Sequence, residues 1–215
     1  MPEPVKPKRR YDSTRRRAQA DATRREILEA AGRLFERQGY AATTMAAVAA
    51  EAGVALKTVY VAFETKSGLL RALWNSLLRG DQGSTPVAES EWYREVLDEP
   101  DPERTLRLNA RNSRLGKERI GGIVQVIRAA APVDPEAQAL WERIESEYHA
   151  NQRRVVESLA PGALRPGLDV GRAADVVWTI NHPGTWHLLV GERGWTPDQY
   201  EEWCADLACA QLLGA

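Results

Sequence analysis

The stretch AEAGVALKTVYVAFETKSGLL, residues 50–70, decides the fold of the first third of the chain. Gly53 separates two short apolar segments, and the second segment carries hydroxyl side chains. Two short helices joined by a glycine turn form a helix-turn-helix, in which the second helix lies in the major groove of DNA. We expect Val48, Val54 and Val59 to hold the two helices at a fixed angle.

Helical periodicity continues on both sides of this stretch. The preceding apolar face ends at Gly39, as helices often end at a glycine, and we expect this first helix to begin near Ser13 or Thr14. Its apolar positions are Ile27, Leu28, Ala31, Leu34 and Phe35. Thr44 and Thr65 are placed to cap the second and fourth helices. The apolar residues of the fourth helix are Leu69, Leu70, Leu73, Trp74 and Leu77.

The rest of the chain also has a helical pattern, in which Asp-Pro and Thr-Pro pairs mark helix starts. Asp101, Asp134 and Thr196 each stand as an N-cap before a proline, and Gln199 completes a capping box with Thr196. We expect helices over residues 106–131, 137–159, 169–192 and 198–213, with Pro183 breaking or kinking the third. No segment alternates with period two, so the sequence predicts an all-α fold with a small N-terminal head and a larger helical body.

Charge is distributed unevenly over the 215 residues, although their net charge is only −1. Residues 1–80 contain 15 Lys and Arg against 8 Asp and Glu, a net +7, and residues 81–215 contain 14 against 22, a net −8. A basic head favours a polyanionic partner, and the alternative is a chance clustering of solvated charge. We predict a basic, partly disordered arm at 1–20, a helix-turn-helix domain at 21–80 and a body at 81–215. The arm either contacts phosphates and the minor groove or is a solvated tail.

The sequence disfavours several classes of protein. No segment resembles a signal peptide or reaches the length of a membrane span, so we expect a cytoplasmic protein with no membrane partner. His149, His182 and His187 lack metal-ligand spacing, and no nucleophile elbow or phosphate loop is present. We therefore expect no metal, no cofactor and no enzymatic activity. Cys204 and Cys209 are about 140° apart on a helix, which argues against a disulfide between them.

Three segments together resemble the DNA-binding domain of the tetracycline-repressor (TetR) family of regulators. They are ILEAAGRLFERQGYAATTM, VAAEAGVALKTVYVAF and TKSGLL, and with their fixed spacings they cover about 60 residues. The resemblance implies a three-helix helix-turn-helix head followed by a C-terminal helical domain for ligand binding and dimerisation. The sequence departs from the family pattern at Ala55, Ala62 and Ser67, which puts two contacts to the DNA backbone in doubt.

The resemblance also implies roles for exposed residues of the head. It places Thr44, Thr58, Tyr60 and Lys66 against phosphates, which position a protein on DNA without reading its sequence. For base readout we expect Ala46, Leu56, Lys57 and Val61. Among these four only the lysine has a donor, which suits the O6 and N7 acceptors of guanine. The alternative for each residue is an ordinary surface or core position.

The partners implied are double-stranded DNA with a near-palindromic operator, a second copy of the chain and an unidentified small-molecule effector. One recognition helix reads few base pairs, so two heads about 34 Å apart in a homodimer would supply specificity. In the family the last two long helices of each subunit form the dimer as a four-helix bundle. The apolar residues that we expect there are Ala173, Val176, Val177, Ile180, Tyr200, Trp203, Cys204, Leu207, Ala208 and Leu212.

Family members mostly repress transcription until a small molecule enters the body. The residues that we expect to line such a cavity are Gln125, Arg128, Trp141, Tyr148, Trp178, Asn181, His182 and Trp186. The alternative is that these aromatic residues form core and dimer interface. Gly121 and Gly122 mark a hinge, an opening beside a ligand or a close helix crossing, and the polar segment RLNARNSRLGKER is expected to be exposed or to line water. A second hypothesis is a redox-responsive regulator that acts through Cys204 and Cys209.

Overall fold

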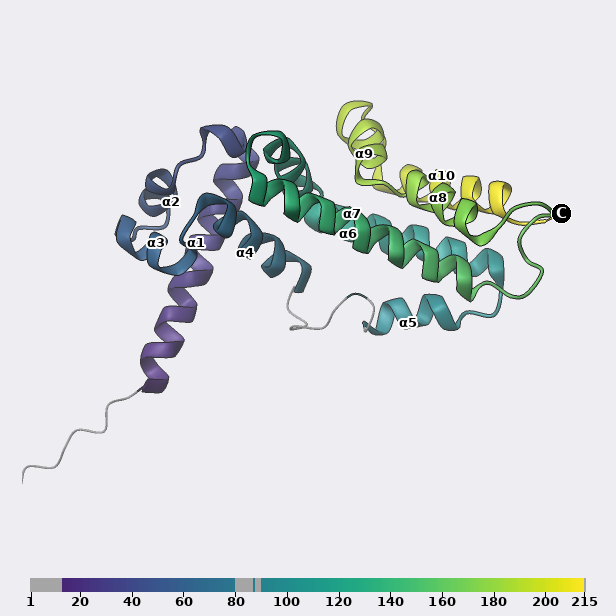
Figure 1. The fold of residues 1–215 in the computed structure, drawn as a ribbon, viewed down its shortest axis with the longest axis horizontal. Helices are drawn as coiled ribbons and strands as arrows, with labels where there is room; N and C mark the ends of the chain where they lie inside the picture. Colours follow the sequence, from purple (N-terminus) through teal and green to yellow (C-terminus); the bar gives the residue numbers. More distant parts are fainter. Residues whose placement is uncertain (1–12, 80–86, 88–89, 215) are drawn as a thin grey trace, which may run out of the picture.

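The computed structural model describes residues 13–79, 87 and 90–214, and helices dominate all of these segments (Figure 1). Within them the only β contact is an isolated antiparallel bridge between Leu164 and Leu213. The all-α prediction is therefore confirmed. Residues 1–12 of the predicted arm lie outside the described residues, and residues 13–20 form the first turns of α1.

The head consists of α1 (Ser13–Ala42), α2 (Met45–Glu51), α3 (Leu56–Phe63) and α4 (Lys66–Arg79). The predicted break at Gly39 is present, because this residue has φ 77° and ψ 173° within the span of α1. A positive φ is a conformation that side chains with a Cβ rarely adopt, so glycine suits the position. The chain then turns back, α2 and α4 pack against α1, and α3 packs against α2 and α4 (Figure 1).

Threonine caps start two of the head helices, as the sequence predicts. The Thr44 hydroxyl accepts a hydrogen bond from the backbone N–H of Ala47 at 3.0 Å. The Thr65 hydroxyl accepts one from the N–H of Gly68 at 2.8 Å. Each bond satisfies a donor that the first turn of a helix leaves without a partner inside the helix.

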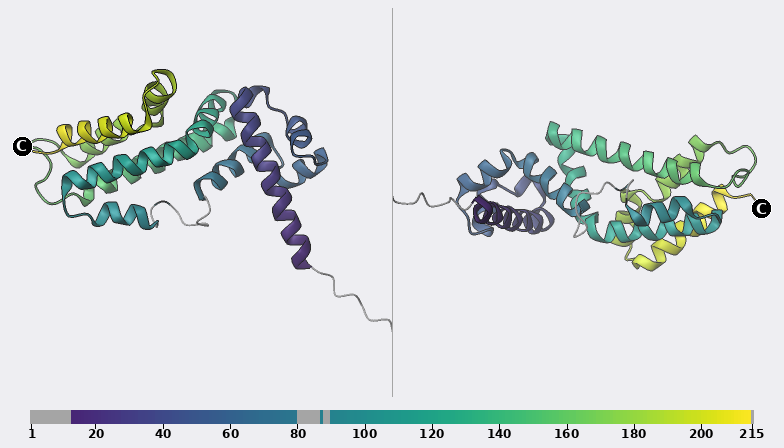
Figure 2. Two further views of the ribbon diagram at one scale, coloured as in Figure 1. Left: turned by 180° about the vertical axis from the view of Figure 1, so that it is seen from behind. Right: turned by 90° about the horizontal axis from the view of Figure 1, so that it is seen from below.

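The body is built around two long helices, α6 (Pro102–Ala130) and α7 (Pro135–Ser158), which the short η3 (Ala131–Val133) connects. The shorter α5 (Glu91–Asp98) packs against both of them. On another side lie α8 (Val170–Ile180), α9 (Pro183–Trp186), the π-helical segment η4 (His187–Glu192) and α10 (Pro197–Leu212) (Figures 1 and 2). The N-caps Asp101 and Asp134 and the capping box of Thr196 with Gln199 are confirmed.

The body has the expected break at Pro183 and one helix that was not expected. The helix predicted over residues 169–192 is interrupted at Asn181 and His182, and Pro183 starts α9 as its first residue. Proline removes a backbone donor and clashes with the preceding turn, so this break follows from the sequence. The helix α5 was not expected, because its eight residues are too short for their periodicity to be distinctive.

One hydrophobic core joins the head to the body. Residues of α1, α2, α3 and α4 pack in it with residues of α6 and α7, and Leu69, Leu70 and Ile127 are fully buried. A second core lies between α6, α7, α8 and α10 and contains Tyr200 and Cys204, also fully buried. No single helix of the described segments is long and apolar enough to cross a membrane. The α2–α3 pair passes that test only together, and it is bent by 114°.

Replacing Gly68 by alanine should destabilise the protein. A Cβ at this position would overlap the carbonyl oxygen of Phe63 and come within 3.0 Å of the Thr65 hydroxyl. Relieving the overlap requires backbone movement, so we expect the free energy of unfolding to fall by about 1–3 kcal/mol. Urea unfolding of the parent and of the Gly68→Ala variant, both at the same protein concentration, measures the change.

Gly116→Ala is the matched control, because a Cβ there meets nothing within 4 Å. Alanine in a helix interior is favoured over glycine by about 0.8–1.0 kcal/mol, so this variant should be more stable than the parent. Equal losses of stability in the two variants would contradict the steric explanation for Gly68.

Candidate nucleic-acid interface and effector cavity

The helices α2 and α3 have the geometry of a helix-turn-helix. The chain bends by 114° between them over a four-residue turn that contains Gly53, whose φ is +66°. Helix pairs of this motif meet at about 90–120°. Val48 and Val59 are fully buried where the two helices meet, and Val54 is half-buried. The expected role of these valines is confirmed.

Seven of the eight residues predicted to contact DNA are exposed on the head. The exposed fraction is 76% for Val61, 48% for Tyr60 and 41% for Leu56, which is unusual for such large apolar side chains. The other exposed residues of the set are Thr44, Ala46, Lys57 and Thr58. The Thr44 hydroxyl accepts its capping bond from Ala47, so its own proton remains available for a phosphate oxygen.

Lys66 differs from the other seven, because it is half-buried and its ammonium group already has partners. Its Nζ donates a hydrogen bond to the carbonyl oxygen of Tyr40 at 2.9 Å and lies 4.1 Å from the centre of the Tyr40 ring. A lysine ammonium has three donors, so these contacts leave capacity for a phosphate. Lys66 therefore connects the start of α4 to the end of α1.

Two departures from the family pattern have structural partners that the sequence did not reveal. The Ser67 hydroxyl donates to Glu136 at 3.0 Å, and an acidic residue at position 67 would place two carboxylates together. The carbonyl oxygen of Ala62 accepts a hydrogen bond from Arg24 at 2.8 Å, and the Arg24 guanidinium lies 4.3 Å from the Phe63 ring. Ala55 is the N-cap of α3 and is exposed without a side-chain capping bond.

The head is tied to the body by hydrogen bonds at the start of α7. The Tyr40 hydroxyl donates to the Asp134 carboxylate at 2.5 Å, next to the Ser67–Glu136 bond. Burial alone would raise the pKa of Asp134. The bonds from Tyr40 and from the backbone N–H groups of Ala137 and Glu136 outweigh burial and hold this pKa below its ordinary value. Burial and Asp134 raise the pKa of Tyr40, so the phenol stays protonated and donates.

Replacing Tyr40 by phenylalanine should weaken this junction in a pH-dependent way. The ring remains to stack on Phe35, but a hydrogen bond to a carboxylate is lost, so we expect a loss of roughly 1.5–3 kcal/mol at pH 7. A depressed carboxyl pKa gives stability above the unfolded value of about 3.9, and that stability is lost as pH falls through the folded value. Urea unfolding should therefore show the parent and the variant converging in acid.

The control for this experiment is Tyr93→Phe. The Tyr93 hydroxyl is also in a half-buried bond, at 2.7 Å, but its acceptor is the neutral backbone carbonyl of Asn151. Loss of this bond should lower the free energy of unfolding by a similar amount at pH 7 and in acid. The assignment to Asp134 fails if the Tyr40 variant shows an equally constant difference from the parent.

A cavity of about 360 Å³ lies in the body, within the size range of small-molecule sites. Its walls come from α4, α5, α6, α7 and α9, and two of the eight predicted residues, Tyr148 and Trp186, line it. Other apolar walls are Trp74, Leu78, Val87, Trp92, Tyr93, Leu115, Ile120, Val124 and Ile144. The Gly121–Gly122 pair lies where side chains of other helices approach α6 closely, and Gly121 also lines the cavity, which fits the expected opening beside a ligand. A Cβ at Gly121 would meet Trp186 at 3.3 Å, and one at Gly122 would meet Glu36 of α1 at 2.7 Å.

The other six predicted ligand residues do not line this cavity, which corrects that part of the expectation. Trp141, Trp178 and His182 pack on one another where α7 meets the α8–α9 break, with ring centres 6.4 and 5.0 Å from that of His182. The His182 ring also contacts Glu145 at 3.1 Å. These ring contacts form at the break that Pro183 makes, and sequence periodicity does not disclose them.

The remaining members of the set lie around the same break. Gln125 donates to the carbonyl oxygen of Pro183 at 3.4 Å, and Arg128 is exposed beside Gly184. Asn181 is buried, and its side-chain oxygen has no hydrogen-bond partner among the described residues. The same is true of the Trp178 indole nitrogen. This cluster forms the packing between α7 and the α8–α9 break.

The polar segment of α6, residues 107–119, is exposed at Arg107, Arg111 and Glu118, as expected, and its other side forms one side of the cavity. Asn109, Asn112, Ser113 and Lys117 all line it. Asn109 donates to buried Gln152 at 2.8 Å, and the hydroxyls of Ser113 and Tyr148 are 2.9 Å apart. Only 6% of the surface of Lys117 is exposed. Sequence reasoning missed this lysine, because it stands in a charged run that resembles a solvated helix face.

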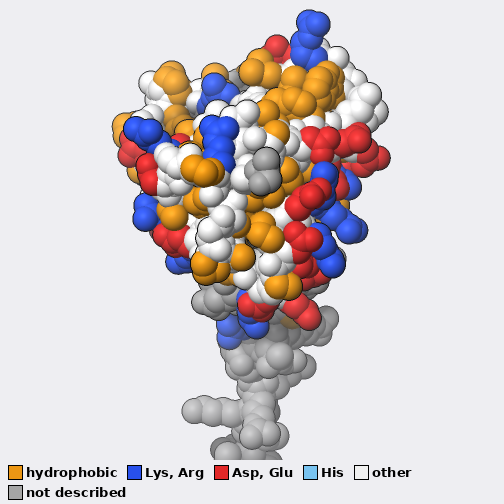
Figure 3. All heavy atoms as spheres, turned by 90° about the vertical axis from the view of Figure 1, so that its right-hand side faces the viewer, with side chains coloured by type: hydrophobic (Ala, Val, Ile, Leu, Met, Phe, Trp, Pro, Cys, Tyr) orange, Lys and Arg blue, Asp and Glu red, His pale blue; other side chains and the backbone are white. Residues whose placement is uncertain are grey.

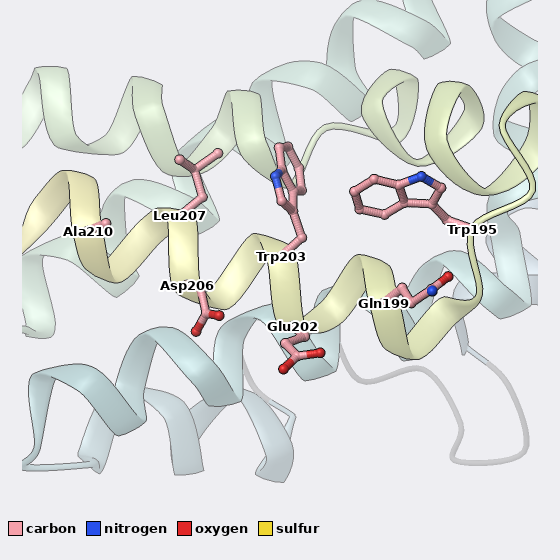
Figure 4. Close-up of a pocket in the computed structure, with 7 residues that line it drawn as sticks. All are labelled: Trp195, Gln199, Glu202, Trp203, Asp206, Leu207 and Ala210. Carbon is pink, nitrogen blue, oxygen red and sulfur yellow. The ribbon is translucent and has the colours of Figure 1, made fainter.

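A second hollow of about 560 Å³ lies on the outward side of α10 (Figure 4). Trp203 and Leu207 point into it, the Trp195 ring faces Trp203, and the two indole rings are 6.0 Å apart and perpendicular. Glu202 and Asp206 also line the hollow, and their carboxylates extend from the opposite side of α10 to Trp203 and Leu207 (Figure 4). The end-on view shows hydrophobic side chains gathered along the upper edge of this end of the molecule (Figure 3).

The expected set of dimer residues needs correction in the light of this arrangement. Seven of the ten are buried within the chain itself and cannot face a partner: Ala173, Val177, Ile180, Tyr200, Cys204, Ala208 and Leu212. The other three, Val176, Trp203 and Leu207, are partly exposed. In α10 apolar side chains lie on the outward face, as Trp203 and Leu207 do, as well as on the inward face, so the sequence did not separate the two faces of this helix.

The cysteines are not arranged for redox sensing. Cys204 and Cys209 form no disulfide, Cys204 is fully buried, and Cys209 is half-buried. Burial raises the pKa of the Cys204 thiol to about 11 and also raises that of Cys209. The thiolate is the reactive form, so these thiols have the character of structural cysteines.

Comparisons with known proteins find bacterial transcriptional regulators that are similar to the head alone and to most of the chain. The family model for bacterial regulatory proteins of the tetR family matches residues 27–73. The probable HTH-type transcriptional regulator ArpR from Pseudomonas putida is 31% identical over 184 residues, which are 81% of this chain and 85% of ArpR.

Solved structures share the fold over most of the length. NalD, the secondary repressor of the MexAB-OprM multidrug efflux pump in Pseudomonas aeruginosa, is 21% identical with a TM-score of 0.66, covering 90% of this chain and 98% of NalD. The SmeT–triclosan complex is 21% identical with a TM-score of 0.68, covering 90% of this chain and 92% of SmeT.

Proposed function

Because the chain belongs to the tetR family of bacterial regulatory proteins, we propose that it is a homodimeric repressor that a small molecule in the body cavity releases from its operator. The family consists of DNA-binding transcriptional regulators, and this chain is one of them. We further propose that the operator is a near-palindrome. A protein that binds chromosomal DNA acts where the chromosome lies, so a cytoplasmic location remains part of the proposal.

The observation that carries the DNA-binding part is the exposed face of α3. Leu56, Lys57, Tyr60 and Val61 project from a helix that Val59 anchors in the core. In this proposal Lys57 reads a guanine, because only its side chain among the base-reading candidates has a donor. Leu56 and Val61 pack on thymine methyl groups, and Tyr60 donates to a phosphate.

The observation that supports the release mechanism is that α4 contacts both the cavity and the end of α1. Trp74 and Leu78 of this helix line the cavity, and Lys66 at its other end bonds to Tyr40 of the head. NalD is a repressor and SmeT has been solved with triclosan, which favours the same scheme for this chain. An effector that displaces Trp74 would move α4 and with it the orientation of α3.

The operator can be found by selecting random DNA duplexes with the full-length protein at moderate salt. We expect the most enriched DNA sequence to be nearly palindromic. Lys57→Ala should lose roughly 10- to 100-fold in affinity for it and should relax the preference at one base pair of each half-site. Binding to single-base variants of that sequence, by parent and variant, measures both effects.

The control variant is Arg153→Ala, because Arg153 forms an exposed ion pair with Glu157 on α7 and lies outside the head. It should leave affinity and base preference unchanged. A uniform loss over all base variants, with a shallower salt dependence, would assign Lys57 to a phosphate instead. No enriched sequence at all would contradict the DNA-binding proposal.

The proposed dimer surface is the outward face of α10 with Trp195, Trp203 and Leu207. Ala210 lines the hollow there and is exposed, so Ala210→Arg should leave the fold intact. It would bury an unpaired charge between subunits, and we expect dimer dissociation to become easier by at least roughly 30-fold. Sedimentation over a concentration series measures this change, together with operator binding.

Ala150→Arg on the exposed part of α7 is the matched control and should behave as the parent does. An Ala210→Arg protein that remains dimeric at the same concentrations would place the interface elsewhere.

A further inference from the structure

A buried lysine without an anionic partner lies at the polar side of the cavity. The Lys117 ammonium donates to the carbonyl oxygen and the hydroxyl of Ser113 and is 3.5 Å from the Tyr148 hydroxyl. Within the described part of the chain no carboxylate forms an ion pair with it. Burying an ammonium group is costly unless an anion compensates its charge, so lysines are seldom buried in this way.

The groups that face Lys117 from neighbouring helices do not supply this charge. Tyr148 comes from α7, and Tyr200 and Cys204 come from α10; burial raises the pKa of all three, so they are neutral near pH 7. The charged residues of the cavity wall, Arg119 and Glu147, are both exposed. Burial lowers the pKa of Lys117 itself to about 7, which reflects the missing counter-charge.

We propose that the effector is an aromatic weak acid whose oxyanion pairs with Lys117 while its flat apolar body lies among the tryptophans of the cavity. This inference rests on the proposed effector site and adds the chemical class of the ligand. The ligand supplies the negative charge that no carboxylate of the cavity provides to Lys117. The Ser113 and Tyr148 hydroxyls orient the lysine ammonium toward the ligand oxyanion. A hydrogen bond between charged groups is among the stronger ones, and burial of the lysine strengthens it further.

The apolar part of the site fits such a body. Trp74, Trp92 and Trp186 come from α4, α5 and α9 and line one cavity with Ile120 and Val124. Flat aromatic ligands stack well on faces and edges of indole rings. The oxyanion fixes the orientation of the ligand, and the tryptophans supply most of the contact area.

The test compares three compounds with one aromatic body: 2-naphthoate, 2-naphthamide and 2-naphthylmethylammonium. Calorimetric titration of the full-length protein without DNA should give tightest binding for the naphthoate, by roughly 10- to 100-fold over the amide, and weakest for the cation. Lys117→Met should bring the naphthoate within roughly threefold of the amide. An amide that binds the parent as tightly as the naphthoate, or no binding by any of the three, would overturn the proposal.

A second readout does not depend on the variant's folding. At about pH 8 most Lys117 side chains of the unliganded parent are neutral, since the pKa is about 7. Pairing with an anion raises the lysine pKa, so naphthoate binding should take up close to one proton. Titrations in HEPES and in Tris buffer, which differ in ionisation enthalpy, measure this uptake. Because pairing must raise the lysine pKa from whatever value it has in the unliganded protein, the titrations are repeated between about pH 7 and pH 10, and no proton uptake with naphthoate at any of these pH values would also overturn the proposal.

The same compounds separate this inference from the proposed function. Naphthoate that binds through Lys117 but leaves the operator complex intact would refute release by this site and leave the ligand class standing. Operator release by the amide alone would support the effector site and refute the anionic ligand.

Discussion

The hydrophobic core shared by head and body is the constraint on which the rest of the structure depends. Leu69, Leu70 and Trp74 of α4 are buried in the same cluster as Val124 and Ile127 of α6 and Leu140 of α7. Protein interiors are packed as densely as organic crystals, so α4 cannot shift without its neighbours shifting too. Such a core favours discrete alternative packings over gradual deformation, which is what a two-state regulator requires.

The hydrogen bonds at the start of α7 fix the orientation of the head on the body. Tyr40 to Asp134 and Ser67 to Glu136 join the end of α1 and the first turn of α4 to one helix end of the body. Bonds are sensitive to angle and distance in a way that apolar contacts are not. They fix which surface of the head meets the body, and therefore where α3 is held relative to the cavity.

Local chemistry made much of the fold predictable from the sequence. The caps at Thr44, Asp101 and Thr196, the break at Gly39 and the break at Pro183 depend on a few neighbouring residues, and all are present. The exposed face of α3 follows from the same periodicity. The cavity could not be predicted from the sequence, because its walls come from five helices whose packing no local pattern encodes. Lys117 is buried only because α7 and α10 cover it, and Trp141, Trp178 and His182 pack together at a break that turns them away from the cavity.

The position of Trp74, at once in the shared core and in the cavity wall, has a thermodynamic consequence. Coupling between two binding sites is reciprocal, so an effector that lowers the affinity for DNA by some factor is itself held more weakly by the DNA-bound protein, by the same factor. For an operator that is almost fully occupied without effector, the effector concentration that clears it therefore exceeds the dissociation constant of the effector from the unbound protein. Extra copies of the operator in a cell would divide the same amount of protein among more sites, so less effector would clear each of them, and the number of target sites helps to set the concentration range over which the protein responds.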